Sequence, residues 1–217
     1  MVLAQLGMSL DGRIATPTGS SRGINGPGAM LHLHRIRALV DAVVIGAGTA
    51  RIDNPRLTVR SCAGESPARV VIDPRGTVGP NSHVWSGDDG ARRLVFGGMP
   101  ELEDIGVERI APPPGEIPPA WIVRRLRAEG LHRVLIEGGG KTVSQFVAAG
   151  EVELLHLLVG PVIIGSGLVG LALPMIDRLD SAQRPDAVVH VFDEGDVLFA
   201  CRLENSGAKR ARSVAVG

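Results

Sequence analysis

Short apolar segments alternate with longer segments of helical periodicity, and this alternation constrains the fold more than any other feature of the chain. Strands that alternate with helices favour a largely parallel sheet covered by helices. The segments expected to form these strands are 2–8, 41–45, 68–72, 93–96, 107–110, 133–136 and 153–159. Helices are expected from Pro27 to about residue 39 and over 120–129 and 142–149. Segments 188–192 and 197–203 are expected to pair antiparallel, so the predicted fold is α/β with a mixed, mostly parallel sheet.

Length and composition narrow the functional classes. The 217 residues suggest one domain over 1–217, with a loose tail over 203–217. Lys plus Arg and Asp plus Glu both number 23, and aromatic residues make up 3%, so no nucleic acid partner is expected. Two isolated cysteines suit a reducing compartment. We find no signal peptide, membrane-length apolar run or metal-ligand spacing, and we expect a cytoplasmic protein with no metal.

The segment Arg133-Val-Leu-Ile-Glu-Gly-Gly-Gly-Lys-Thr142 joins a predicted strand to a predicted helix through three glycines. A P-loop would need a glycine at residue 135, which is a leucine, so that interpretation fails. What remains is a tight turn that lets a ligand approach the backbone, with the amides of the next helix directed at an anion. Glu137 lies at the strand end, where open α/β sheets bind ligands. It faces a ligand there or caps the following helix.

Two further segments follow predicted strands. Gly46-Ala-Gly48-Thr-Ala-Arg51 is a partial dinucleotide fingerprint, because an arginine stands at its third glycine position. The segment 53–60 is expected to be a short turn and strand, in which Arg60 beside Arg37 could bind a phosphate. The alternatives are a simple strand-end turn for the first segment and solvated arginines for the second. Asp73 before a proline is expected to form a turn, and the alternative is that it mimics the ribose-binding acid of a dinucleotide site.

Six segments, in this order, carry a resemblance to a known family. They are Met8-Ser-Leu-Asp-Gly-Arg-Ile-Ala15, His34-Arg-Ile-Arg37, Asp41-Ala-Val-Val-Ile-Gly-Ala-Gly-Thr49, Asp53-Asn-Pro-Arg-Leu-Thr-Val-Arg60, Glu137-Gly-Gly-Gly140 and Val159-Gly-Pro-Val-Ile-Ile-Gly165. Together they resemble the riboflavin-biosynthesis pyrimidine reductases, which form the C-terminal domain of bacterial bifunctional deaminase–reductases and also occur alone. The resemblance extends from residue 2 to about residue 203.

The resemblance implies a dihydrofolate-reductase-like α/β fold, a homodimer, and NADPH-dependent reduction of a ribosylamino-pyrimidine 5′-phosphate to the ribitylamino compound. By matched position, the residues that would contact NADPH are Gly7, Thr49, Asp53, Gly139, Gly140, Lys141, Thr142, Val143 and Ser144. Those that would face the substrate are Ser21, Arg37, Leu57, Arg60 and Glu137. Pro74 stands where relatives often carry a cofactor-contacting serine, which makes Arg75 the candidate for binding the cofactor 2′-phosphate.

The chain departs from the family pattern at Gly23, Asn54 and Lys141, where relatives often carry a tryptophan, a second acid and a smaller residue. Its triple-glycine loop is similar to that of the archaeal and fungal branch, whose members reduce before deamination.

Glu137 is the first candidate for the catalytic carboxylate, and Asp53 is the second. An ionised carboxylate would stabilise a protonated imine formed by opening of the ribosylamine. Two other functions remain open at this point. One is a reductase of the same fold that acts on a dihydropterin, a dihydrofolate or a secondary metabolite, and the other is a non-catalytic NADPH-binding module.

Overall fold

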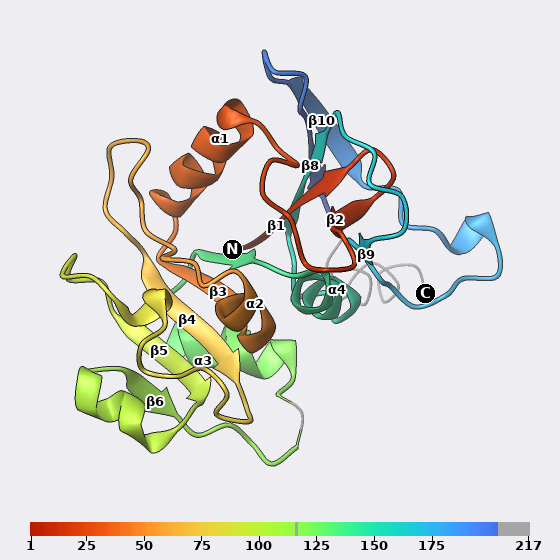
Figure 1. The fold of residues 1–217 in the computed structure, drawn as a ribbon. Coiled ribbons are helices and arrows are strands. Elements are labelled where there is room, and N and C mark those ends of the chain that lie inside the picture. The colour runs from red at the N-terminus through yellow and green to blue at the C-terminus, as the bar shows by residue number, and fades with distance from the viewer. Residues whose placement is uncertain (116, 204–217) are drawn as a thin grey trace. The chain divides into compact units, whose positions relative to one another are not determined.

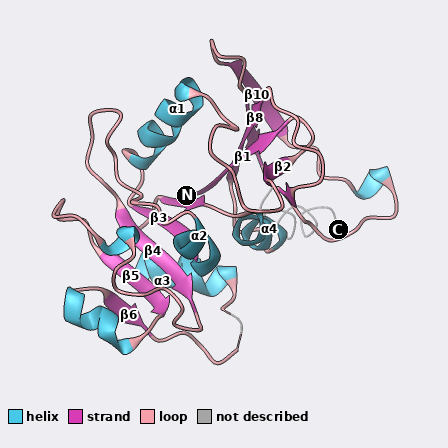
Figure 2. Ribbon diagram, in the orientation of Figure 1, coloured by secondary structure: helices cyan, strands magenta, loops and turns pink. Residues whose placement is uncertain are grey.

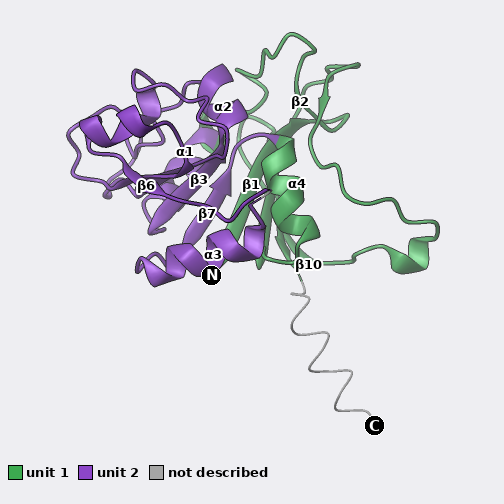
Figure 3. Ribbon diagram, turned by 90° about the horizontal axis from the view of Figure 1, so that it is seen from below, with its two compact units in different colours: residues 1–29, 140–217 green, residues 30–139 purple. Residues whose placement is uncertain are grey.

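The computed structural model describes residues 1–115 and 117–203. The chain forms two compact units, which are coloured separately in Figure 3. Unit 1 contains residues 1–29 and the chain from residue 140 onward, and unit 2 contains residues 30–139. One reductase domain over 1–217 stays a prediction. From residue 204 onward, the tail predicted for 203–217 lies outside the described residues.

A parallel sheet forms the centre of unit 2, with the strand order β7-β3-β4-β5-β6. Its strands are β3 (Ala42–Gly46), β4 (Ala68–Asp73), β5 (Arg93–Gly97), β6 (Glu108–Ile110) and β7 (Val134–Glu137). The first four residues of β3 are fully buried. Such continuous apolar runs are typical of parallel strands that are covered on both faces.

Helices cover the two faces of this sheet (Figures 1 and 2). Helix α2 (Ala47–Ile52) contacts β3 and β4, and α3 (Pro119–Ala128) lies on the opposite face. Trp121 of α3 packs edge-on against Phe96 of β5, with ring centroids 5.5 Å apart. The 3₁₀ helices are η1 (His83–Trp85) and η2 (Pro100–Ile105). Helix α1 (Pro27–Arg37) begins in unit 1 and ends in unit 2.

Unit 1 has a mixed sheet in the order β10-β11-β8-β1. Strands β1 (Val2–Ser9) and β8 (Leu154–Gly160) are parallel, whereas β11 (Val197–Arg202) runs antiparallel to β8 and to β10 (Asp186–Val191). A short pair joins β2 (Arg13–Ala15) to β9 (Leu168–Val169). Helix α4 (Gly140–Ala148) contacts β1, and η3 (Leu179–Ser181) precedes β10.

The predicted α/β class, the mostly parallel pairing and the C-terminal antiparallel hairpin are confirmed. The chain after Gly46 forms helix α2, so the alternative of a simple strand-end turn does not hold. One local expectation was wrong. The segment 53–60 contains no strand, because Asn54 and Leu57 take φ values of 42° and 58°, which are incompatible with extended pairing. No helix of the described chain is long and apolar enough to cross a bilayer.

Candidate functional site

Glu137 and Arg37 form a buried ion pair in unit 2. Glu137 ends β7, and Arg37 ends α1. Arg37 Nε donates to Glu137 Oε2 at 2.9 Å, and Nη2 donates to Oε1. Arg37 Nη1 donates to the carbonyl oxygen of Thr58 at 3.1 Å. The side chains of Arg37 and Glu137 are only 6% and 15% exposed, so this bidentate geometry fixes the carboxylate at the strand end.

Arg60 is the second predicted phosphate ligand, and the structure places it beside the first. Its side chain is exposed, and Nη1 lies 3.4 Å from Thr58 Oγ1. Partial desolvation lowers the pKa of Arg60, and the neighbouring charges of Arg37 and Arg56 lower it further, although Arg60 remains cationic. Since every nitrogen of the Arg37 guanidinium already has a protein acceptor, Arg60 is the cation better placed to receive an anion.

His34 belongs to the same group of side chains, and the sequence assigned it no role. It is 2% exposed, and its Nδ1 accepts the backbone N–H of Arg60 at 3.3 Å. Burial lowers the pKa of His34, and the positive charges of Arg37 and Arg60 lower it further. The group therefore combines two guanidinium cations with one carboxylate and a neutral imidazole, which leaves a positive site suited to phosphate.

The loop between α2 and β4 carries several predicted site residues in an irregular conformation. Leu57, predicted to face the substrate, is 1% exposed and belongs to the core of unit 2. Asn54 Oδ1 accepts the backbone N–H of His83 at 2.7 Å. Asp53 is exposed and follows the last residue of α2. Its backbone N–H donates to the carbonyl oxygen of Thr49. The substrate role of Leu57 and the cofactor and catalytic roles of Asp53 stay predictions.

Thr49 and the glycine turn are brought together, although about 90 residues separate them in the chain. The backbone N–H of Gly139 donates to Thr49 Oγ1 at 2.9 Å. Gly138 has a φ of 122°, and a Cβ placed on it would lie 3.0 Å from the same oxygen. The turn therefore needs glycine for its conformation and for the close approach of Thr49. Two regions predicted to contact one cofactor are neighbours in unit 2.

Helix α4 of unit 1 carries the remaining part of the predicted cofactor loop. Lys141 is exposed and Thr142 is half-buried. Val143 is fully buried, and Ser144 Oγ accepts the backbone N–H of Ala172 at 2.9 Å. A Cβ on Gly140 would collide with the carbonyl oxygen of Gly170. The side chains of Val143 and Ser144 thus face the interior of unit 1, and a cofactor contact at these positions would use their backbone.

In unit 1, Gly7 of β1 packs against the segment that precedes α1. A Cβ on Gly7 would collide with Asn25 Oδ1. Asn25 Nδ2 donates to Asp196 Oδ1 at 2.7 Å, and Asp196 Oδ2 accepts the backbone N–H of Gly26 at 2.8 Å. Asp196 is 1% exposed and was not predicted from the sequence, since 171 residues separate it from Asn25. Ser21 lies in the loop before this segment and is half-buried, and its substrate contact stays a prediction.

Asp73 forms a turn, as expected. Its Oδ2 accepts the backbone N–H groups of Thr77 and Val78 at 2.7 and 2.8 Å, and Oδ1 accepts the Thr77 hydroxyl at 3.0 Å. Asp73 is also only 1% exposed, so its carboxylate stabilises the turn and does not face a ribose hydroxyl from the surface. Arg75 is exposed within this turn, beyond the end of β4.

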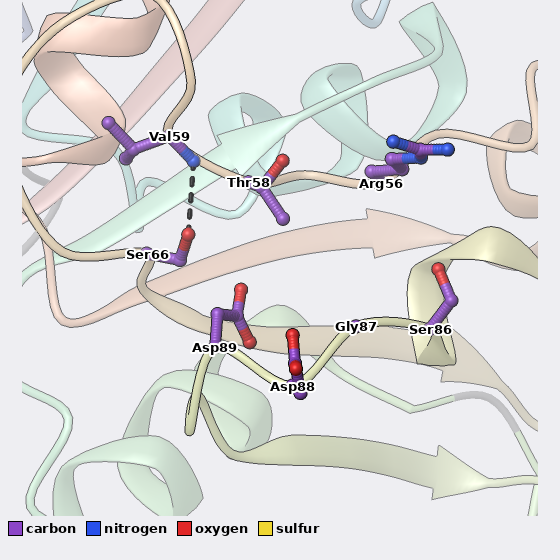
Figure 4. A pocket seen from close by; sticks show the side chains of 8 residues that line it. All are labelled: Arg56, Thr58, Val59, Ser66, Ser86, Gly87, Asp88 and Asp89. Atoms are coloured by element: carbon purple, nitrogen blue, oxygen red, sulfur yellow. Dashed lines mark hydrogen bonds between the residues drawn. The ribbon is translucent and has the colours of Figure 1, made fainter.

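Thr58 also lines a pocket of about 400 Å³ (Figure 4). It is lined by Arg56, Thr58, Val59, Ser66, Ser86, Gly87, Asp88 and Asp89. Ser66 Oγ accepts the backbone N–H of Val59 at 3.1 Å, as the dashed line in Figure 4 shows. Asp89 pairs with the fully buried Arg69. Within the described chain, no group of three or more His, Cys, Asp and Glu side chains is placed to hold a metal ion.

Comparisons of the sequence identify similar proteins. Residues 1–176 match the family model described as the RibD C-terminal domain. Riboflavin biosynthesis protein RibD of Chlamydia muridarum is 31% identical over 210 residues, which cover 92% of this chain and 56% of that protein. A 2,5-diamino-6-ribosylamino-4(3H)-pyrimidinone 5′-phosphate reductase of Methanothermobacter thermautotrophicus is 30% identical over 183 residues, which cover 76% of this chain and 79% of that protein.

Solved structures agree with these matches. A diaminohydroxyphosphoribosylaminopyrimidine deaminase/5-amino-6-(5-phosphoribosylamino)uracil reductase from Thermotoga maritima superposes with a TM-score of 0.80 and 27% identity, over 94% of this chain and 56% of that one. The Saccharomyces cerevisiae riboflavin biosynthesis reductase Rib7 shares the fold, with a TM-score of 0.72 and 20% identity over 94% and 90% of the two chains. This chain therefore spans 56% of the length of the Chlamydia and Thermotoga proteins.

Proposed function

Because the chain belongs to the family of RibD C-terminal domains, we propose that it is an oxidoreductase of riboflavin biosynthesis. It reduces a ribosylamino-pyrimidine 5′-phosphate to the ribitylamino-pyrimidine 5′-phosphate with NADPH as the cofactor. The substrate class agrees with the names of the relatives from Methanothermobacter and Thermotoga.

The observation that carries this proposal is the Arg37–Glu137 ion pair with Arg60 beside it. Arg60 receives the substrate phosphate, because its guanidinium is exposed whereas that of Arg37 is held by Glu137 and Thr58. Glu137 is held in one orientation at the end of β7, next to the glycine turn. There its negative charge stabilises the protonated imine that forms when the ribose ring opens at C1′. Reduction adds a hydride at C1′ and leaves a secondary amine.

A nicotinamide cofactor supplies that hydride, and the glycine turn of unit 2 fits such a group. Gly138 and Gly139 are half-buried, and side chains at either position would crowd Thr49, which lies against the same turn. Thr49, Asp53 and Gly139 are proposed to contact the cofactor in unit 2. The cofactor contacts expected for Gly7 and for the first turn of α4, which belong to unit 1, stay predictions. The N–H groups of a first helical turn have no partner within the helix, which suits them to a diphosphate.

Arg75 is proposed to select NADPH over NADH. It is exposed in the turn that Asp73 stabilises, so its guanidinium is free to meet the 2′-phosphate that distinguishes the two cofactors.

An assay of NADPH oxidation tests the activity, with the diamino and the deaminated ribosylamino-pyrimidine phosphates supplied separately. Turnover of one of them by the purified chain is expected, and the preferred pyrimidine places the reaction before or after deamination. Binding of NADPH without its oxidation in either assay would instead indicate a non-catalytic binding module. Oxidation only with a dihydropterin or dihydrofolate would indicate another reductase of this fold.

The Arg60→Ala variant tests the phosphate site. Loss of charge-assisted bonds worth about 1.5–3 kcal/mol should raise the KM for the phosphorylated pyrimidine about 10- to 100-fold, with little change in the KM for NADPH. Arg124→Ala on the exposed side of α3 is the matched control and should leave both constants unchanged. An unchanged KM in Arg60→Ala would show that the phosphate binds elsewhere.

A homodimer is also proposed, in which β10 lies in the interface. All six residues of this edge strand are exposed, and Val188, Val189 and Val191 are 73%, 53% and 62% exposed. Exposed apolar edge strands invite pairing with another chain. Sedimentation should show a dimer at micromolar concentration and a monomer for Val189→Lys, and a monomeric wild type would contradict the proposal.

A cytoplasmic location stays a prediction.

A further inference from the structure

Two side chains of α1 hold the loop that carries Arg60. His34 and Arg37 are three residues apart, so they lie on one face of the helix. His34 Nδ1 accepts the backbone N–H of Arg60, and Arg37 Nη1 donates to the backbone carbonyl of Thr58. The helix thus binds one donor and one acceptor of the same loop, two residues apart. These contacts matter because the loop forms no strand of its own.

The hydrogen bond defines the protonation state of His34. A ring nitrogen that accepts a backbone N–H carries no proton, so the imidazole is neutral with its hydrogen on Nε2. The charged groups that act on this ring are Arg37, Arg60 and Glu137, and Glu137 is already paired with Arg37. Burial and the two arginines disfavour an imidazolium and outweigh Glu137 and a bond to the Thr58 backbone, which favour it, so the pKa of His34 lies below its ordinary 6.5. At neutral pH the acceptor is therefore maintained.

We propose that His34 is a positioning residue for the phosphate of the substrate: its neutral Nδ1 holds the backbone of Arg60 and thereby directs the Arg60 guanidinium at the phosphate. His34 does not touch the phosphate in this arrangement, and it acts only through Arg60. The inference rests on the proposed function, because it takes Arg60 as the cation that binds the substrate phosphate.

A double-mutant cycle tests this role. His34→Ala should raise the KM for the phosphorylated pyrimidine about 3- to 10-fold, the size of one net hydrogen bond, and should leave kcat and the KM for NADPH unchanged. His34→Asn places an amide oxygen near the position of Nδ1 and should stay within about twofold of wild type. In an Arg60→Ala background, the His34→Ala change should not raise this KM further, because the guanidinium through which His34 acts on the phosphate is absent.

Two kinetic results would overturn the inference. One is an equal rise in KM from His34→Ala in the wild-type and Arg60→Ala backgrounds, which would mean that His34 acts independently of Arg60. The other is a wild-type KM in a folded His34→Ala protein. If alanine prevents folding, His34→Leu replaces it, since leucine fills the buried space without providing an acceptor.

Nuclear magnetic resonance separates this inference from the proposed function. In the wild type, the ¹⁵N shift of His34 Nδ1 should be that of an unprotonated nitrogen, and the Arg60 amide should exchange slowly. That protection should be lost in His34→Ala and kept in His34→Asn. An Arg60 amide equally protected in all three proteins refutes the positioning role. An unchanged KM in Arg60→Ala alone refutes the phosphate assignment.

Discussion

Glycines in the two units serve different physical purposes. In unit 2, Gly138 takes a φ of 122° that L side chains rarely adopt, and the turn it forms brings Gly139 to Thr49. In unit 1, Gly7 and Gly160 lie on neighbouring parallel strands, and Cβ atoms there would collide with Asn25 Oδ1 and the carbonyl oxygen of Ile24. The first region needs glycine for backbone conformation, and the second needs it because another segment crosses the strands.

That difference predicts which glycine replacements lower the stability of the protein and which weaken ligand binding. A glycine required by a crossing segment belongs to the packing of its unit, so its replacement should lower stability first. A glycine required by a turn at a proposed ligand site should affect binding at a smaller cost in stability.

Gly160→Ala should have the largest effect. The added methyl meets the backbone carbonyl of Ile24, which no rotamer change can remove, so we expect a loss of about 3 kcal/mol in the free energy of unfolding. Urea denaturation measures it. Gly48→Ala is the matched control, since no atom lies within 4 Å of its Cβ and alanine favours the helix α2 by up to about 1 kcal/mol. Equal stability of the two variants would contradict the crossing-segment explanation.

Gly138→Ala should have an intermediate effect on stability and a clear effect on cofactor binding. The strained φ costs about 1–2 kcal/mol, and the Cβ lies 3.0 Å from Thr49 Oγ1. Calorimetric titration with NADPH should show weaker binding than in Gly139→Ala, whose Cβ would lie 3.3 Å from the same oxygen with no positive φ. Wild-type NADPH affinity in Gly138→Ala would remove this turn from the cofactor site.

Asp11→Asn should have the smallest effect, and that effect should depend on pH. The Ser9 hydroxyl donates to Asp11 Oδ1, and the amides of Ile164 and Gly165 donate to the same carboxylate. The Ser9 bond, followed by the amide of Ile164, lowers the pKa of Asp11 to about 2 from 3.8. Because the folded pKa is the lower one, the carboxylate stabilises the folded protein above about pH 4, and this contribution is lost as pH falls through about 2.

Urea midpoints measured between pH 2 and 7 should therefore show the wild type above Asp11→Asn at neutral pH, with the difference closing at the acid end. A difference in urea midpoint that stays constant over this pH range would show that the contribution of Asp11 to stability does not depend on its charge.

The sequence predicted the strands well, because a buried parallel strand is a continuous apolar run that ends at polar or glycine residues. It also predicted Glu137 at a strand end, which the structure confirms. The sequence assigned Thr49 and the glycine turn to one cofactor site; the structure places the two in contact, and the cofactor site stays a prediction. Helix α2 was missed because its first residues, Ala47 and Gly48, follow a glycine in a pattern equally typical of a turn.

What the sequence could not provide were the pairings between distant residues. Arg37 and Arg60 were predicted together as phosphate ligands, yet Arg37 is occupied by Glu137, 100 residues away in the chain. The sequence assigned His34 no role, because its bond to Arg60 depends on the irregular loop that φ values at Asn54 and Leu57 create. Such contacts follow from tertiary structure rather than from periodicity or spacing.

The Arg37–Glu137 pair also limits how this chain can change by mutation. Removing either partner leaves the other charge buried and uncompensated, which costs about 3–5 kcal/mol in comparable pairs, a large share of the stability of a typical domain. Replacing both by apolar residues of similar volume costs far less stability. The two replacements must occur one after the other, however, and the first leaves one buried charge without its partner. The two positions are therefore expected to be retained or lost together among descendants of this sequence, with neither drifting alone.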